Sequence, residues 1–243
     1  MESYRRRLYQ HYAEAGGPGL AGVEADPLGP RAAHLQDLIR RYFPPDRNAA
    51  ILDLGCGHGA LLHFLRQAGY QNTLGVDWSA SQVAAAAKHG LTGIIQGDVL
   101  QVLAAQPAAS RDVVVAYDLL EHFTRDELLH CLDEVCRVLK SGGRCIIHAP
   151  NGASPFGGRV RYGDLTHELA LTRDSLTQVC RVCGFSRVDC FEDQPVPHGL
   201  KSGLRWLLWK VIRGGWRFYL AVETGVMDPG LIFTQNLYCI AVK

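Results

Sequence analysis

Several features that would assign a chain to a broad class at once are missing from this sequence. It has no excess of either charge, because 25 lysines and arginines stand against 24 aspartates and glutamates. Bulk electrostatics therefore give no reason to expect a nucleic-acid partner. No run of about eighteen uncharged apolar residues is present, so a membrane-spanning helix is not expected. The start is basic but continues into no apolar segment with a cleavage site, so a secretory signal is not expected either.

The cysteines, eight in number, also lack the spacing of a metal site. Cys180 and Cys183 form one C-x-x-C pair, but no second pair stands at the distance that zinc sites use. Several of the others fall in expected strands or helices, where a reduced thiol acts as a small apolar side chain. We therefore expect reduced thiols, no disulfide and no bound metal, as in a cytoplasmic protein.

The most informative segment is residues 51–59, which read Ile-Leu-Asp-Leu-Gly-Cys-Gly-His-Gly. Its apolar start, its acid Asp53 and its alternating glycines predict a strand, a tight turn and then a helix. Glycines let the backbone turn sharply and approach a ligand without a Cβ atom in the way. The spacing is not G-x-G-x-x-G, and no Lys-Ser/Thr follows as in a P-loop. The pattern therefore does not require a dinucleotide or a nucleoside triphosphate.

Acidic residues recur at the ends of the following expected strands. Asp77, Asp98 and Asp118 each stand at or just after the end of an apolar run. An acid at the tip of the second strand can accept hydrogen bonds from both hydroxyl groups of a ribose. Because the carboxyl ends of parallel strands share one edge of a sheet, we expect these acids and Asp53 to face a single ligand.

Strands alternate with helices along the chain, which predicts right-handed crossovers and a mostly parallel sheet. Helices are expected at 31–42, 59–68, 79–89, 99–105, 125–139 and 172–183, a sixth strand at 185–191 and a last strand at 232–242. Thr172, with Ser175 in the first turn, is expected to cap the helix at 172–183. We expect residues 1–243 to form a single α/β domain. Within it, residues 1–30 are expected to form an N-terminal helical lid or connection, and residues 151–171 and 193–227 substrate-side insertions.

Together these segments resemble the class I S-adenosylmethionine-dependent methyltransferases, densely over residues 48–151 and more loosely over 172–243. Within that class they are similar to the small-molecule type, such as the bacterial O-methyltransferases of polysaccharide and secondary-product pathways. The resemblance implies a doubly wound, Rossmann-like sheet of seven mainly parallel strands in the order 3-2-1-4-5-7-6. It also implies that the final strand is antiparallel and that helical lids are inserted.

The resemblance further implies S-adenosylmethionine as the cofactor. The turn that begins at Asp53 would hold its methionine end, and Asp77 would bind its ribose. Trp78 would pack against the adenosine, and Asp98 with Val99 would hold the adenine. The complete set of residues expected to contact the cofactor is Asp53, Gly55, Cys56, Gly57, Asp77, Trp78, Asp98, Val99 and Asp118.

Methyl transfer to a hydroxyl group needs an acceptor in line with the S–CH₃ bond and a group that removes the hydroxyl proton. His122, in the pair Glu121-His122 directly after the fourth strand, is one candidate base. Histidine suits this role because it exchanges a proton near neutral pH. The alternative is a histidine that caps a turn or bonds a backbone carbonyl group.

A second candidate lies in the long Gly-rich segment after the fifth strand. Residues 163–168, Gly-Asp-Leu-Thr-His-Glu, resemble a segment that closes over the substrate in many bacterial methyltransferases. Three interpretations are open for Asp164, His167 and Glu168. They form a base with its orienting carboxylate, they hold a divalent cation that acidifies a vicinal diol, or they only fix the loop at a helix entry.

Residues 203–223 are rich in aromatic and basic side chains. Two stripes run along the expected helix, an apolar one of Leu204, Leu207, Leu208, Val211 and Ile212, and an aromatic one of Trp206, Trp209, Arg213 and Trp216. Such a helix covers a substrate pocket, forms a homodimer face or lies on a membrane surface. Peripheral membrane contact through 203–223 would fit a lipid-linked sugar acceptor. Gly214 and Gly215 are expected to break or kink the helix.

The sequence thus predicts a methyltransferase that uses S-adenosylmethionine to O-methylate a small hydroxylated acceptor, with a sugar or glycan favoured. The alternatives within the enzyme class are an N-methyltransferase and a quinone or phenol O-methyltransferase. A non-catalytic scaffold that binds S-adenosylmethionine is the alternative outside it. A nucleic-acid methyltransferase is disfavoured, because no Asn/Asp-Pro-Pro-Tyr/Phe signature follows the fourth strand.

Overall fold

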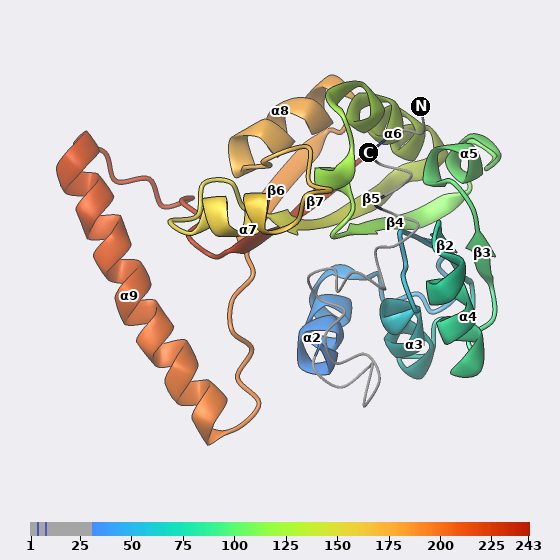
Figure 1. The fold of residues 1–243 in the computed structure, drawn as a ribbon, viewed down its shortest axis with the longest axis horizontal. Coiled ribbons are helices and arrows are strands. Elements are labelled where there is room, and N and C mark those ends of the chain that lie inside the picture. Colours follow the sequence, from blue (N-terminus) through green and yellow to red (C-terminus); the bar gives the residue numbers. More distant parts are fainter. Residues whose placement is uncertain (1–3, 5–7, 9–30) are drawn as a thin grey trace.

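A seven-stranded sheet runs through the centre of the molecule (Figure 1). The computed structural model describes Tyr4, Leu8 and residues 31–243, so most of the expected N-terminal lid at 1–30 lies outside the described residues. The strands are β1 (Ile51–Leu54), β2 (Thr73–Asp77), β3 (Ile94–Gln96), β4 (Arg111–Tyr117), β5 (Leu139–Pro150), β6 (Arg187–Glu192) and β7 (Asn236–Val242).

The strand order is β3-β2-β1-β4-β5-β7-β6, which confirms the order that the sequence implied. Neighbours from β3 to β5 are parallel. β7 is antiparallel to both β5 and β6, between which it lies. The carboxyl ends of β1 to β5 therefore meet at one edge of the sheet, as a doubly wound topology requires.

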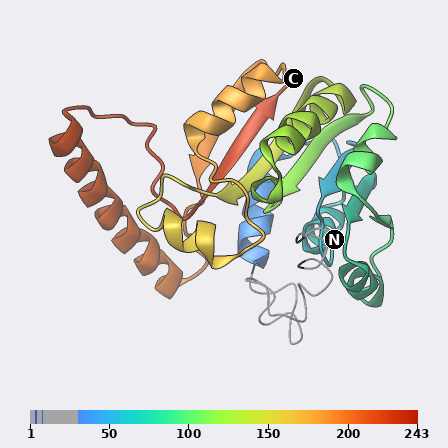
Figure 2. The ribbon, with the colours of Figure 1, turned by 45° about the horizontal axis from the view of Figure 1, so that its top comes forward.

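Helices cover both faces of the sheet. They are α2 (Ala32–Tyr42), α3 (Ala60–Gln67), α4 (Ala80–Lys88), α5 (Val99–Ala104), α6 (Arg125–Val138), α7 (Gly157–Gly163), α8 (Arg173–Val182) and α9 (Leu200–Thr224). Figures 1 and 2 show α2, α3 and α4 on one face and α5, α6 and α8 on the other, with α9 to one side. A short 3-10 helix, Leu120–His122, follows β4.

The strands are apolar along their length because each face of the sheet packs on a helical layer. In β4, Val114 and Ala116 belong to the core that contains the buried residues of α6 and α8. Val113 and Val115 belong to the opposite core, with α2 and α3. Complete burial of a valine contributes roughly 1.5–3 kcal/mol, so both layers are fixed firmly against the sheet.

Helix caps fix the points at which α6 and α8 begin, after the chain has left the carboxyl edge of the sheet. Thr172 caps α8, as the sequence predicts: its side chain accepts from the backbone N–H of Ser175, and the Ser175 side chain bonds back to Thr172. Thr124 and Glu127 form the same reciprocal arrangement at the start of α6. Each such cap contributes about 1 kcal/mol.

The expected break in α9 is wrong. This helix continues through Gly214 and Gly215 without interruption. Glycine lowers helix stability by about 1 kcal/mol relative to alanine, but its backbone adopts helical angles freely. The long run of apolar and basic residues on either side therefore keeps the helix intact. Among the helices built from described residues, none combines the length and the apolar character that crossing a bilayer requires.

The last strand is shorter than expected, since β7 begins at Asn236 and not at residue 232. The side-chain amide of Asn151 donates to the carbonyl oxygens of Ile232 and Thr234 at 2.9 and 3.0 Å. These two carbonyl groups therefore accept hydrogen bonds from a side chain, whereas in a strand they would accept them from the backbone of a neighbouring strand.

Candidate active site

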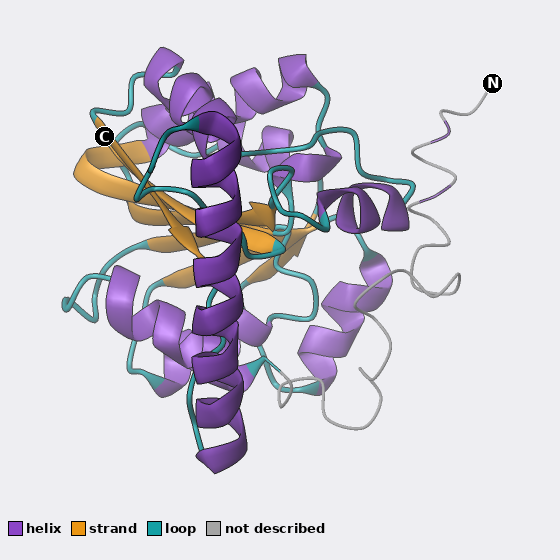
Figure 3. Ribbon diagram, turned by 90° about the vertical axis from the view of Figure 1, so that its left-hand side faces the viewer, coloured by secondary structure: helices purple, strands orange, loops and turns teal. Residues whose placement is uncertain are grey.

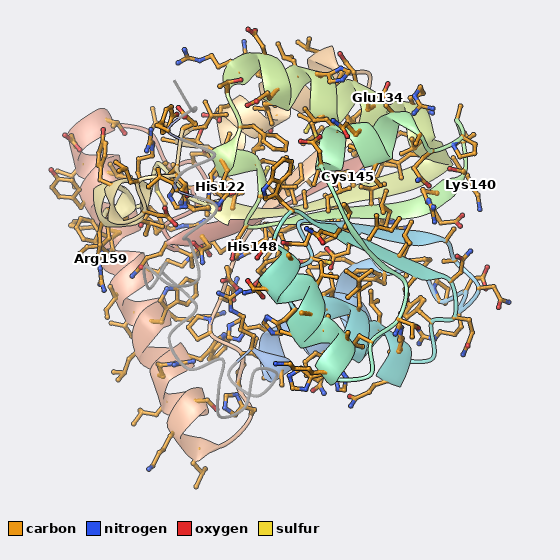
Figure 4. The ribbon with its side chains drawn as sticks, turned by 45° about the vertical axis from the view of Figure 1, so that its right-hand side comes forward. His122, Glu134, Lys140, Cys145, His148 and Arg159 are labelled. Carbon is orange, nitrogen blue, oxygen red and sulfur yellow. The ribbon has the colours of Figure 1, made fainter. Side chains whose placement is uncertain are left out.

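The predicted site residues lie at the carboxyl ends of the strands or on the segments that follow them. Figure 4 shows His122 and His148 toward this edge, and Lys140, near the start of β5, at the opposite edge. In open α/β sheets the ligand binds in the crevice outside the carboxyl ends of the strands. The geometry of these segments therefore decides what the site can do.

The turn after β1 is bonded to the end of β2. Gly57 has a φ of 54°, in the left-handed region that favours glycine. The backbone N–H groups of Gly57 and Ser79 donate to the two carboxylate oxygens of Asp77, both at 2.8 Å. Cys56 donates its backbone N–H to the carbonyl oxygen of Val76 at 2.9 Å. Asp77 thus shapes the glycine turn, and each of its oxygens keeps a further lone pair for a ligand hydroxyl.

Asp53 is a buried acid within β1, next to the glycine turn. Its side chain is almost fully buried, and its Oδ1 atom accepts no hydrogen bond from the described residues. Burial, together with the carboxylate of Asp77, raises the pKa of Asp53 to about 8. A cationic ligand group would lower that pKa and supply the missing partner. The ammonium group of S-adenosylmethionine is such a cation, so the residues present fit this cofactor.

We expect Asp53→Asn to stabilise the ligand-free protein at high pH. The folded pKa of about 8 exceeds the unfolded value of about 3.9. Folding thus disfavours the charged carboxylate, and stability is lost as the pH rises between these two values. Asparagine keeps the shape of the side chain and removes this dependence.

The measurement is the melting temperature of the two proteins at several pH values. At about pH 8 the melting temperature of the variant should exceed that of the parent by roughly 5 °C, which corresponds to ~2 kcal/mol of unfolding free energy for a chain of this size. At about pH 4 the two melting temperatures should differ little. A variant that melts lower than the parent by the same amount at both pH values would contradict the prediction.

The predicted adenine-binding residues follow two neighbouring strands. β2 and β3 are aligned so that Asp77 lies beside Gln96. Asp98 caps α5, and its Oδ1 atom accepts from the backbone N–H groups of two residues in that helix at 2.9 and 3.0 Å. Val99 is buried at the start of α5, whereas Trp78 is exposed. A carboxylate accepts up to about four hydrogen bonds, so capping leaves Asp98 able to bind a ligand.

Asp118 is engaged by a buried histidine at the end of β4. Its φ of 51° is uncommon for a residue other than glycine. Its Oδ1 atom lies 2.5 Å from Nδ1 of His148, whose Nε2 atom lies 3.4 Å from Oδ2 of Asp193. Burial opposes charge on His148, but Tyr117 and the two aspartates hold the pKa of His148 well above its usual value. Asp118 thus fixes the end of β4, and its contact with a cofactor stays a prediction.

The segment after β4 and the segment 163–169 are bonded to each other. The backbone N–H groups of Glu168 and Leu169 donate to the carbonyl oxygen of Glu121 at 2.8 and 3.0 Å. Leu119, just before this point, packs so closely on Gly55 that a Cβ atom there would lie 3.0 Å from its Cδ1 atom. The two candidate base segments therefore meet each other beside the glycine turn.

Two hydrogen bonds in series orient His122. Its Nδ1 atom lies 3.0 Å from Oγ1 of Thr166, which lies 2.6 Å from Oδ1 of Asp164. Because the Thr166 hydroxyl donates to the carboxylate, its oxygen accepts from Nδ1–H of His122, and Nε2 is the basic nitrogen. Burial, and next the neighbouring His167, lower the pKa of His122. The ring is therefore neutral near pH 7 and able to take up a proton.

His167 lies against His122. The ring centroids are 4.9 Å apart in an edge-to-face arrangement. Nδ1 of His167 lies 3.1 Å from the carbonyl oxygen of Val160, which can only accept, so Nε2 is again the basic nitrogen. The sequence interpretation grouped Asp164 and Glu168 with His167 as a base and its orienting carboxylate, and in the structure Asp164 also reaches His122 through Thr166. Glu168 contributes backbone bonds that hold the segment in place.

A third group, Glu121, completes a cluster with these histidines. It is almost fully buried, and its Oε2 atom has no hydrogen-bond partner among the described residues. Burial raises the pKa of Glu121 well above its usual value. Glu121, His122 and His167 offer ligand atoms that all lie within 4.8 Å of one another. Two imidazoles and a carboxylate suit a divalent transition metal, so among residues 31–243 this set could hold a cation.

Several residues of the site were not identified from the sequence. His148 had a signal, because it is a polar residue within the apolar run of β5. Thr166 and Asp193 had none, since Thr166 meets His122 only when the segment 163–169 folds back. Asp193 meets His148 only through the order of the strands in the sheet.

The strand order, the glycine turn with its buried acid, and the acids at the carboxyl edge define a class. They are the features of a class I S-adenosylmethionine-dependent methyltransferase. Residues 52–147 match the family model described as a methyltransferase domain. Over these residues the chain is similar to a methyltransferase domain, and S-adenosylmethionine is the cofactor of the class whose strand order it shares.

Individual proteins show the same similarity. The ubiquinone biosynthesis O-methyltransferase of Xylella fastidiosa (strain 9a5c) is 31% identical over 136 residues, which are 52% of this chain and 54% of that protein. The chain thus spans about half the length of the curated relatives it matches.

Among solved structures, a SAM-dependent methyltransferase from Archaeoglobus fulgidus has a TM-score of 0.66 and 19% identity, covering 99% of this chain and 100% of that one. Phosphoethanolamine N-methyltransferase 2 of Haemonchus contortus, in complex with S-adenosyl-L-methionine, has a TM-score of 0.63 and 15% identity. It covers 100% of this chain and 60% of that one. At these identities the solved structures show that the fold is shared.

Proposed function

We propose that this protein transfers the methyl group of S-adenosylmethionine to a hydroxyl oxygen of a small acceptor, with a sugar or glycan as the favoured class. The observation that carries the proposal is the meeting of His122 and His167 beside the glycine turn, each with Nε2 as its basic nitrogen. Removal of a hydroxyl proton needs such a base, whereas methylation of a neutral amine needs little base assistance.

When bound, S-adenosylmethionine supplies an electrophilic methyl group. Asp77 and Asp98 would bind the nucleoside, and Asp53 would bind the ammonium group. His122 Nε2 would accept the hydroxyl proton as the acceptor oxygen bonds to the methyl carbon and the sulfur–carbon bond breaks. Asp164, acting through Thr166, would then stabilise the positive charge on the ring, as a carboxylate does in other oriented histidines.

A second form of the mechanism uses a divalent cation held by Glu121, His122 and His167. Such a cation would bind two vicinal hydroxyl groups of the acceptor and lower the pKa of the one that reacts. Sugars and catechols both carry vicinal hydroxyl groups. The name of the Xylella relative favours a quinone or phenol acceptor as the second candidate class.

The remaining parts of the chain belong to the same proposal. Residues 1–243 would act as one domain, with 151–171 and 193–227 on the substrate side. The bonds between Glu121 and residues 168–169 support this for the first of these segments. All eight cysteines are free thiols, which supports a cytoplasmic location. The favoured sugar or glycan acceptor would place the protein in polysaccharide biosynthesis or a related pathway.

The test is a transfer assay with methyl-labelled S-adenosylmethionine and three acceptor sets: sugars and glycans, catechols and phenols, and primary amines. We expect label on a hydroxyl oxygen, in the sugar set before the phenol set. Activity that is lost with a chelator and restored by a divalent cation would support the metal form. Label on amines alone, or S-adenosylhomocysteine binding in calorimetry without turnover of any acceptor, would overturn O-methylation.

A further inference from the structure

The long helix α9 uses only one of its two stripes to contact the rest of the protein. The aromatic stripe is the half-buried one, and it includes Trp206, Trp209 and Arg213. The Arg213 Nε atom forms an ion pair with the nearly buried Oε2 atom of Glu192 in β6, at 2.5 Å. Near the end of the helix, the Arg217 guanidinium donates to the carbonyl oxygen of Pro229. These contacts set the rotation of the helix about its axis.

The start of α9 is fixed as well. Ser202 is buried, and its hydroxyl accepts from the backbone N–H of His198 at 2.8 Å and donates to the carbonyl oxygen of Gly199 at 2.9 Å. These bonds cap the start of the helix, and the contacts of Arg213 and Arg217 hold the helix to the rest of the protein. Figure 3 shows it lying across one side of the molecule, in front of the sheet, with its whole length presented outward.

The stripe on the opposite side of α9 is apolar and exposed. The side chains of Leu207, Leu208 and Phe218 are 55%, 54% and 72% exposed, and Leu204, Val211 and Ile212 lie between these values. Large apolar side chains that are scattered singly over a surface need no explanation, but a continuous row does. With 25 residues the helix is about 37 Å long, so the row is a long, narrow surface along one side of the helix.

The charge on α9 is strongly one-sided. The helix carries five basic residues and one acid, Glu223, although the whole chain has a net charge of only +1. Arg205 and Lys210 lie on the two flanks of the apolar row. The Nζ atom of Lys210 lies 4.3 Å from the ring centroid of Trp206, and a long flexible side chain of this kind can turn toward a charged surface. Trp216 and Tyr219 lie at its border and stack edge to face, with centroids 6.2 Å apart. Indole and phenol rings at such a border are typical of the headgroup zone of a membrane.

We propose that the exposed face of α9 docks the protein on an anionic lipid surface. Its apolar row enters the boundary between headgroups and acyl chains, while Lys201, Arg205 and Lys210 contact the lipid phosphates. The helix lies in the plane of the membrane, since its basic residues prevent it from crossing. The proposal depends on the surface of α9 alone and holds whichever acceptor the protein methylates.

A second copy of the chain fits this face less well. Pairing two copies through the apolar row would bring the basic flanks of one helix beside those of the other. Helices that pair stably carry complementary charges along their flanks, and here one acid faces five basic residues. Arg213 and Arg217 are engaged by the protein itself, whereas an anionic surface can contact Lys201, Arg205 and Lys210 together, which is why we assign the face to lipid.

The experiment is flotation of the full chain with phosphatidylcholine vesicles and with vesicles in which phosphatidylglycerol replaces a third of the lipid. We expect binding to the anionic vesicles, reversed by high salt. The variant Lys201→Gln/Arg205→Gln/Lys210→Gln should bind on the order of a hundredfold more weakly, because each cation near an anionic surface contributes about a fivefold gain. The variant Leu207→Glu/Val211→Glu should lose binding. Val182→Glu, an equally exposed apolar residue on α8, is the matched control and should bind normally.

Circular dichroism and melting curves confirm that each variant is folded. Absence of binding by the full chain to anionic vesicles would overturn the proposal, and so would normal binding by Leu207→Glu/Val211→Glu. A dimer in light scattering that this variant converts to a monomer would show that a second copy covers the face, and would equally overturn it.

Discussion

Replacing Asp77 with alanine is expected to weaken the binding of S-adenosylhomocysteine by about a hundredfold or more. A hydrogen bond to a charged group contributes roughly 1.5–3 kcal/mol, and the ribose offers two hydroxyl donors. The substitution also removes both bonds to the backbone N–H groups of Gly57 and Ser79, so the glycine turn loses its fixed shape. Isothermal titration calorimetry with S-adenosylhomocysteine measures the effect directly.

Two further variants separate the contributions to this loss. Asp77→Asn keeps one acceptor oxygen and the shape of the side chain, so its affinity should fall between those of the parent and the alanine variant. Asp126→Ala removes an exposed acid at the start of α6, far along the chain from the glycine turn, and should bind normally. Unchanged affinity in Asp77→Ala would show that the ribose binds elsewhere.

The second large effect is expected at the base. His122→Ala should lower kcat with a hydroxylated acceptor by roughly 10²–10⁴-fold, the usual contribution of a positioned base. Binding of S-adenosylhomocysteine should change little, because His122 lies outside the set proposed to contact the cofactor. Initial rates at saturating cofactor, together with calorimetry, distinguish the two quantities.

The companion variants show which histidine takes the proton. Thr166→Val breaks the connection from Asp164 to His122 and should lower kcat less than His122→Ala. His167→Ala should resemble His122→Ala if both hold a cation, and be milder if His122 acts alone. His130→Ala, an exposed histidine on α6, is the matched control. A normal rate in the double variant His122→Ala/His167→Ala would favour N-methylation over O-methylation.

Features that depend on neighbouring residues were predictable from the sequence. The turn at residues 55–59 was predictable because its glycines and the apolar run before them are contiguous in the chain. The strand order followed from a resemblance carried by several such local patterns in a fixed sequence. The cap at Thr172 was predicted for the same reason, since its partner Ser175 lies only three residues away.

Features that depend on distant contacts were not predictable in the same way. Both His122 and His167 were identified as candidates, but their contact arises from bonds between residues 121 and 168–169. The connection from Asp164 through Thr166 to His122 was not predicted, because a threonine hydroxyl gives no sequence signal of its own. The continuity of α9 was missed because the low helix propensity of two glycines is a weak guide where the surrounding residues favour a helix.

The position of β7 has a consequence for the protein during translation. This strand follows β6 in the chain by more than forty residues, yet it occupies the place between β5 and β6. While the ribosome is still extending the chain, β5 has an open edge of unpaired backbone N–H and C=O groups, and β6 has no partner strand. The apolar helix α9 also emerges during this interval. The nascent chain is therefore most exposed to aggregation just before residues 236–242 are released and fill the gap.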